Sequence, residues 1–128
     1  MQLLLVEDQP NDIRIAARAA EASGFSEVEA RSSAGAARVY LEKALTGAHP
    51  LPDAILLDLD LGYESGFELL RFWHSDPEIA KVPLVVWTVL GDQYREICGL
   101  FRVKAYIYKG EDLSVLREVL SGLTRLSA

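Results

Sequence analysis

Cysteine and histidine are scarce in this sequence of 128 residues. It contains one cysteine, Cys98, and two histidines. One cysteine cannot form an internal disulfide, and there is no group of cysteines and histidines at the spacing of metal ligands, which argues against zinc. A lone cysteine is typical of a reducing compartment, so we expect a cytoplasmic protein.

Long apolar runs and an excess of basic residues are also missing. The first apolar stretch, residues 3–6, is followed at once by Glu7 and Asp8, so it is too short for a signal peptide or a membrane span. The chain has 13 Lys and Arg against 19 Asp and Glu, a formal net charge of −6. This charge repels nucleic-acid phosphates and anionic membranes. We therefore expect neither as a direct partner, and small cations or basic protein surfaces fit better.

What the sequence does contain suits one α/β domain over residues 1–128. Half of the residues are hydrophobic and a quarter are charged, which indicates a real core. Short apolar segments of strand length alternate with segments whose apolar residues repeat at helical spacing. The five strand candidates are residues 3–6, 28–31, 54–57, 84–88 and 105–108. This alternation predicts a five-stranded parallel sheet, doubly wound as (βα)5, in the flavodoxin-like three-layer order.

Each of the five helical segments is expected to bury one face. The second follows Ser33, the third has Ser65 as N-cap and stops before Pro77, and the last starts at Asp112. The predicted inward residues, helix by helix, are Ile13, Ala16, Ala17 and Ala20; Ala34, Ala37, Leu41, Ala44 and Leu45; Phe67, Leu70 and Trp73; Tyr94, Ile97, Cys98 and Phe101; Leu113, Leu116, Leu120 and Leu123.

Polar residues stand at the ends of four of the predicted strands. Glu7 and Asp8 follow the first, Asp58 the third, Thr88 ends the fourth, and Lys109 follows the fifth. Open α/β sheets bind ligands beyond the carboxyl ends of their strands. Three carboxylates brought together there would need a hard divalent cation, and Mg²⁺ is the natural candidate because it is typically held by one or two carboxylates together with a phosphate group.

Four stretches of the sequence carry a family resemblance: LLLVEDQPND, PDAILLDLDLGYESGFELL, VPLVVWTVLGD and AYIYKG. Together they resemble the receiver domain of bacterial two-component response regulators, over nearly the whole chain. The specificity lies in the ordered set of the acidic pair, Asp58 with Gly66 eight residues later, Thr88 and Lys109. The stretches VEDQPND and SDPEIAKVPLVVWT are most similar to chemotaxis-regulator-like, single-domain regulators of the phytochrome-associated type.

The resemblance implies a phosphorylation chemistry. Asp58 would accept a phosphoryl group from a phosphohistidine of a sensor histidine kinase or a phosphotransfer protein. Asp8 and Asp58 would bind Mg²⁺ directly, Glu7 would act on it through water, and the backbone carbonyl of Asp60 would complete the protein ligands. Lys109 would neutralise charge on the phosphoryl group. Such a domain promotes only its own phosphorylation and dephosphorylation and is not otherwise an enzyme.

The resemblance also implies a conformational switch. Thr88 would hydrogen-bond a phosphoryl oxygen and draw in the loop that follows it. Tyr106 would be the aromatic residue that turns inward as Thr88 moves. The fourth helix, the fifth strand and the fifth helix would then present an altered face to a downstream protein target, and a homodimer is possible.

Several positions depart from the family pattern. Gly62 and Gly110 stand where prolines are usual, so the loop at the metal and the aim of Lys109 are expected to be looser. Val89 replaces a small residue and is expected to slow phosphoryl turnover. Asp60 adds a fourth carboxylate near the metal. The segment FRVKAY, residues 101–106, lacks the usual Gly-Ala step, which predicts a remodelled fourth helix.

Two other functions remain open from the residues. Asp58-Leu59-Asp60 resembles the nucleophile motif of haloacid-dehalogenase-type phosphatases, although such an enzyme has no need of Glu7 and Asp8. A pseudo-receiver would keep the fold and act as an unphosphorylated protein-interaction module. Such a module would have no reason to keep a cluster of carboxylates that repel one another.

Overall fold

The chain is built around a parallel sheet of five strands in the order β2-β1-β3-β6-β7. The computed structural model describes residues 1–127. The strands are β1 (Gln2–Val6), β2 (Glu27–Arg31), β3 (Ala54–Leu57), β6 (Leu84–Thr88) and β7 (Ala105–Tyr108). The predicted flavodoxin-like order is confirmed, and the strand order reverses between β1 and β3, the place at which sheets of this kind bind ligands.

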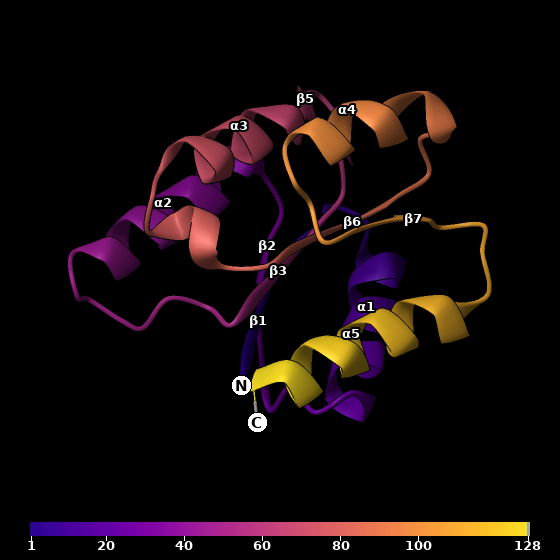
Figure 1. The fold of residues 1–128 in the computed structure, drawn as a ribbon, viewed down its shortest axis with the longest axis horizontal. Helices are drawn as coiled ribbons and strands as arrows, with labels where there is room; N and C mark the ends of the chain where they lie inside the picture. Colours follow the sequence, from indigo (N-terminus) through magenta and orange to yellow (C-terminus); the bar gives the residue numbers. More distant parts are fainter. Residues whose placement is uncertain (128) are drawn as a thin grey trace.

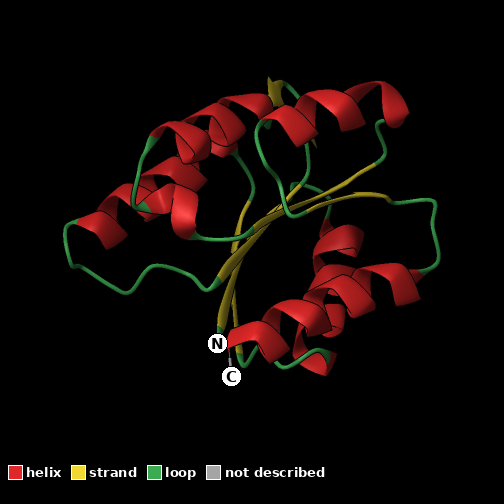
Figure 2. Cartoon of the chain, in the orientation of Figure 1, coloured by secondary structure: helices red, strands yellow, loops and turns green. Residues whose placement is uncertain are grey.

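Helices cover both faces of this sheet. On one side lie α1 (Pro10–Ala22) and α5 (Leu113–Ser127), and on the other lie α2 (Ala34–Leu45), α3 (Phe67–Ser75) and α4 (Arg95–Leu100) (Figure 1; helices red and strands yellow in Figure 2). Because strand side chains alternate, Leu4 and Val6 pack under α2 and α3, whereas Leu3 and Leu5 pack under α1 and α5. No helix within residues 1–127 is long and apolar enough to cross a membrane.

Short elements at the sheet's edges complete the fold. A two-stranded hairpin, β4 (Asp60–Leu61) with β5 (Glu64–Ser65), follows β3, and 3₁₀ turns cover Ile79–Lys81 and Asp92–Tyr94. The hairpin was not predicted, since two-residue strands leave too little pattern to detect.

Gly66, rather than Ser65, is the N-cap of α3. The Ser65 hydroxyl still accepts a hydrogen bond from the Phe67 N–H at 3.1 Å, but Ser65 itself belongs to β5. A Cβ atom at Gly66 would lie 2.5 Å from the carbonyl oxygen of Asp58. The glycine is therefore required by the close approach of the helix start to the end of β3.

Three of the predicted inward residues are exposed instead. Leu45 is the last residue of α2, whose final turn is buried through Ala44, and Leu113 is the first residue of α5. Ile97 is exposed because α4 has only six residues and packs through Cys98. Helical spacing identifies an apolar face, but tertiary packing decides how far along the helix that face is covered.

Candidate functional site

Strand register brings the predicted polar residues to one edge of the sheet. Val6 pairs with Leu57 and Leu57 with Val86, so Glu7 and Asp58 follow neighbouring strands at the same level. At the other side of β6, the Lys109 N–H donates to the Thr88 carbonyl at 2.8 Å.

Lys109 is the centre of this edge. Its ammonium donates to Glu7 Oε1 at 2.6 Å, Asp12 Oδ2 at 2.7 Å and Asp58 Oδ2 at 2.8 Å. Its side chain is only 8% exposed, and the Nζ atom lies 4.8 Å from the centre of the Trp87 ring. A buried ammonium is stable here because carboxylates accept all three of its hydrogen bonds.

Asp12 is the residue that the sequence analysis missed. It lies in the first turn of α1, which starts directly after the acidic pair. That position was a usable signal, because a helix that follows a strand returns over the same end of the sheet. Asp60, by contrast, has an exposed side chain. Asp12, through its bond to Lys109, is thus a fourth carboxylate of the cluster. That the Asp60 carboxylate also lies near the metal stays a prediction.

The carboxylates themselves are held by backbone donors. Glu7 Oε2 accepts from the N–H groups of Asp8 at 3.0 Å and Gln9 at 3.2 Å, and Asp58 Oδ1 accepts from the Asp60 N–H at 3.0 Å. Asp8 Oδ1 is buried with no hydrogen-bond partner. A buried carboxylate oxygen without a donor is costly unless a cation supplies the missing interaction.

The donor set fits a hard divalent cation. One oxygen from each of Glu7, Asp8 and Asp58 lies within 4.8 Å of the others. Carboxylate oxygens are the ligands that Mg²⁺ and Mn²⁺ prefer. The orphaned oxygen of Asp8 points to the same requirement, so the residues present fit a divalent metal.

The pKa values of Glu7 and Lys109 are both raised, for different reasons. Burial raises the pKa of Glu7 to about 7, and the hydrogen bond from Lys109 only partly offsets this effect. Burial alone would lower the pKa of Lys109, but the bonds to Asp12, Asp58 and Glu7 outweigh it and raise that pKa. Without a cation, the Glu7 carboxyl therefore keeps its proton to a higher pH than an exposed glutamate does.

The predicted switch residues meet in the loop after β6. Thr88 is fully buried, and its Oγ1 accepts from the Leu90 N–H at 3.3 Å. The Tyr106 hydroxyl donates to the carbonyl oxygens of Leu90 and Gly91, at 3.0 and 2.9 Å. Arg95 also donates to the Tyr106 carbonyl at 2.9 Å, with its guanidinium carbon 4.9 Å from the ring centre. Burial raises the pKa of Tyr106 to about 12. Tyr106 therefore points inward, toward the loop that follows Thr88.

Two glycines at the rim have definite structural reasons. Gly62 has a φ of 72° in the two-residue turn between β4 and β5, and a Cβ atom there would lie 3.2 Å from Asp8 Oδ2. Proline cannot adopt this φ, so the turn between β4 and β5 favours glycine at this position. That Gly62 makes the loop looser stays a prediction. At Gly110, a Cβ atom would overlap the Tyr108 ring at 2.2 Å.

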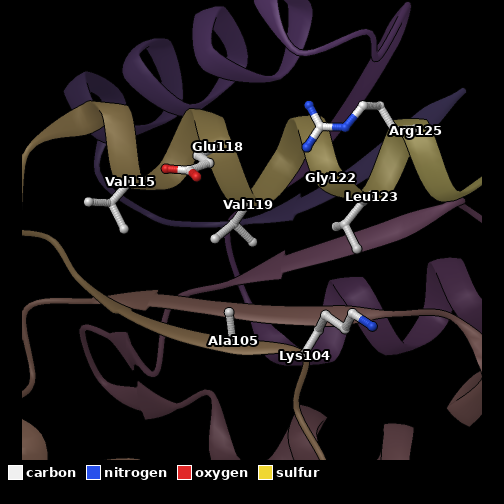
Figure 3. A pocket seen from close by; sticks show the side chains of 8 residues that line it. All are labelled: Lys104, Ala105, Val115, Glu118, Val119, Gly122, Leu123 and Arg125. Carbon is white, nitrogen blue, oxygen red and sulfur yellow. The ribbon is translucent and has the colours of Figure 1, made fainter.

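A separate groove lies between β7 and α5, away from the charged edge. It has a volume of about 400 Å³, with Ala105, Val115 and Val119 on its walls and Lys104, Glu118 and Arg125 beside them (Figure 3). It holds none of the predicted site residues.

Comparison with known proteins establishes the family. A crystal structure of the phosphorylated cyanobacterial phytochrome response regulator RcpA is 31% identical in sequence, covers 98% of this chain and 91% of its own, and superposes with a TM-score of 0.79. The chain belongs to the response regulator receiver domains. No family model matches it.

Further relatives agree with this assignment. The response regulator Rcp1 of Synechocystis sp. is 27% identical over 124 residues, 94% of this chain and 84% of Rcp1. A crystal structure of the Mn²⁺-bound form of Rcp1 is 26% identical, covers 98% of this chain and 93% of its own, and has a TM-score of 0.78. The resemblance to receiver domains, including phytochrome-associated ones, is confirmed. Such receivers are signalling proteins of two-component systems rather than classical enzymes, and act with histidine kinases and downstream targets.

Proposed function

We propose that this receiver domain accepts a phosphoryl group on Asp58 from a phosphohistidine of a sensor kinase or phosphotransfer protein, with Mg²⁺ as its cation. One observation carries the proposal. Asp58 is only 3% exposed, and its two oxygens are oriented by Lys109 on one side and by the Asp60 N–H on the other. A carboxylate held in this way is a positioned nucleophile.

The phosphoryl transfer is a nucleophilic displacement at phosphorus. A carboxylate oxygen of Asp58 forms the new P–O bond while the P–N bond to the donor imidazole breaks, and its electron pair stays on the imidazole nitrogen. Lys109 neutralises charge on the phosphoryl oxygens, since positioning and electrostatics dominate such reactions.

Four residues would hold the cation. Asp8 and Asp58 would bind it directly, Glu7 through water, and Asp60 through its backbone carbonyl. When bound, Mg²⁺ would neutralise further charge on the phosphoryl group. The unpartnered Oδ1 of Asp8 supports this assignment.

The switch would run through Thr88 and Tyr106. The Thr88 hydroxyl accepts from the Leu90 N–H and retains its own proton for donation to a phosphoryl oxygen. Such a bond would pull on residues 89–91, and the carbonyls of Leu90 and Gly91 accept from the Tyr106 hydroxyl. The face formed by α4, β7 and α5, which includes the groove of Figure 3, would then shift between two conformations for a downstream protein.

Val89 is proposed to slow phosphoryl turnover, because its side chain stands exposed directly after Thr88. A Val89→Ala variant should be phosphorylated and dephosphorylated faster. Unchanged rates in both directions would refute this role. We further propose that residues 1–128 act as one domain in the cytoplasm, where Cys98 stays reduced.

Intact mass after incubation with Mg²⁺ and acetyl phosphate tests the function. We expect the wild type to gain one phosphoryl group and Asp58→Asn to gain none. The thermal stability of the wild type should rise with Mg²⁺, and that rise should be lost in Asp8→Ala. A wild type that gains no mass and shows no such rise would instead be a pseudo-receiver.

A further inference from the structure

The hydrogen bonds of Lys109 are saturated. An ammonium has three N–H donors, and those of Lys109 go to Glu7, Asp12 and Asp58 at 2.6, 2.7 and 2.8 Å. The side chain is 8% exposed. For Lys109 to contact a phosphoryl group, as the proposed function requires, one of these three bonds must be given up.

Asp58 is the partner whose bond changes in the reaction. Phosphorylation turns its carboxylate into an acyl phosphate, and the negative charge moves outward to the phosphoryl oxygens. The N–H group that pointed to Asp58 Oδ2 can follow this charge. The ammonium stays at the site only if its other two bonds persist, and those are the bonds to Glu7 and Asp12.

Asp12 differs from the other carboxylates of the cluster. Its side chain is 27% exposed, against 1% for Glu7 and 3% for Asp58. The oxygens that come close enough to share a metal belong to Glu7, Asp8 and Asp58. The contact that Asp12 makes is with the ammonium, from the first turn of α1.

We propose that Asp12 is a positioning residue that anchors Lys109 from the α1 side while the third hydrogen bond of the ammonium passes from Asp58 to the phosphoryl group. This inference rests on the proposed function. The anchor requires an acceptor oxygen of the right reach, so Asn should preserve most of it and Ala should abolish it.

The test is the rate of phosphorylation by acetyl phosphate at saturating Mg²⁺, followed by intact mass. In this reaction Asp58 forms a bond to phosphorus, the P–O bond to the acetyl group breaks, and its electron pair leaves with acetate. We expect Asp12→Ala to slow the reaction roughly tenfold, since a misplaced charged group loses much of its effect. Asp12→Asn should stay within about threefold of the wild type.

Two readouts separate anchoring from a structural or metal-binding role. The Mg²⁺ dissociation constant should change by less than about twofold in Asp12→Ala. In a Trp73→Phe background, where Trp87 is the remaining tryptophan, fluorescence should change in Asp12→Ala and not in Asp12→Asn, because Lys109 Nζ lies 4.8 Å from the Trp87 ring. Glu21→Ala, an exposed carboxylate at the other end of α1, controls for the loss of one negative charge.

Asp12→Ala at the wild-type rate would overturn the proposal, and so would a rate loss that follows weaker Mg²⁺ binding. If Asp12→Ala does not fold, Asp12→Ser replaces it, because a serine hydroxyl is too short to reach Lys109. A failure of the proposed function appears earlier and separately, as a wild type that gains no phosphoryl group.

Discussion

The charged edge of the sheet and the α4 segment lie on either side of the proposed switch residues, and they differ in burial and in bonding. At the edge, Lys109 joins three carboxylates at 2.6 to 2.8 Å, almost out of contact with water. In the segment 89–103, α4 has six residues, Leu100 is 76% exposed, and Arg102 has a φ of 65°. A short helix, an exposed leucine and a residue in the left-handed region indicate a segment of low local stability. The reacting edge is therefore the more tightly bonded of the two regions, and we expect conformational freedom to be concentrated in the α4 segment.

Removal of the Lys109 charge should have the largest effect on the free energy of unfolding, because it removes the bonds that distinguish the charged edge from the α4 segment. Lys109→Met leaves Glu7 and Asp58 buried without their cationic partner. We expect a loss of about 3 kcal/mol in the free energy of unfolding, measured by urea denaturation without divalent cations. Lys81→Met is the matched control, since Lys81 pairs with Glu78 in solvent and its loss should cost less than about 0.5 kcal/mol. Equal losses in the two variants would show that the edge is no better bonded than the surface.

Tyr106→Phe should weaken the link between the two regions. It removes the hydroxyl that donates to Leu90 and Gly91, and we expect a loss of about 1 kcal/mol. Tyr63→Phe, at a fully exposed tyrosine, should change nothing. A loss below about 0.3 kcal/mol for Tyr106→Phe would mean that these hydrogen bonds do not hold the loop.

The same hydroxyl predicts a pH dependence. Burial raises the pKa of Tyr106 to about 12, above the value of about 10 in an unfolded chain. Its contribution to stability is therefore complete below about pH 10 and is lost as the pH rises through 12. Alkaline titration of tyrosinate absorbance should show a late component that Tyr106→Phe abolishes. Early ionisation of every tyrosine would contradict it.

Arg102→Gly should stabilise the α4 segment. Arg102 follows the C-cap of α4 in the left-handed region, which costs a residue with a Cβ atom about 1 kcal/mol. We expect a gain of about that size in urea denaturation. Arg18→Gly, in the exposed interior of α1, should lose about 1 kcal/mol. A gain in stability for Arg102→Gly together with a loss for Arg18→Gly would confirm the strain at Arg102. A loss of stability in both variants would refute it.

The smallest perturbation leaves the sequence intact and uses Cys98 as a reporter. This thiol is fully buried in α4, and burial raises its pKa to about 11, so it should not react with a thiol reagent until α4 opens. We expect labelling faster than global unfolding allows, because the segment opens locally. A labelling rate equal to that predicted from the global free energy of unfolding would show that α4 opens only with the whole domain.

The parts of the molecule that were predictable are those with strong local patterns. Apolar runs, helical spacing and the connection rules predict the five strands and their order. They also predict that the polar residues at the strand ends lie at one edge of the sheet: Glu7, Asp8, Asp58, Thr88 and Lys109. Asp12 was missed because it lies in the first turn of α1 and not directly after a strand, so the rule that ligands bind at strand ends does not select it. The exposure of Ile97 and Leu45 was missed because a periodic face does not say where its partner ends.

The sequence by itself determined the alternation of strands and helices, the parallel sheet, and the placing of acidic residues after buried strands, because side-chain period and solvent exclusion act locally. Only the tertiary structure decided which carboxylates share Lys109, which way Tyr106 points and why Gly62 and Gly66 are glycines. The physical reason is that hydrogen bonds and steric contacts depend on the distances between elements far apart in the chain, to within a few tenths of an ångström.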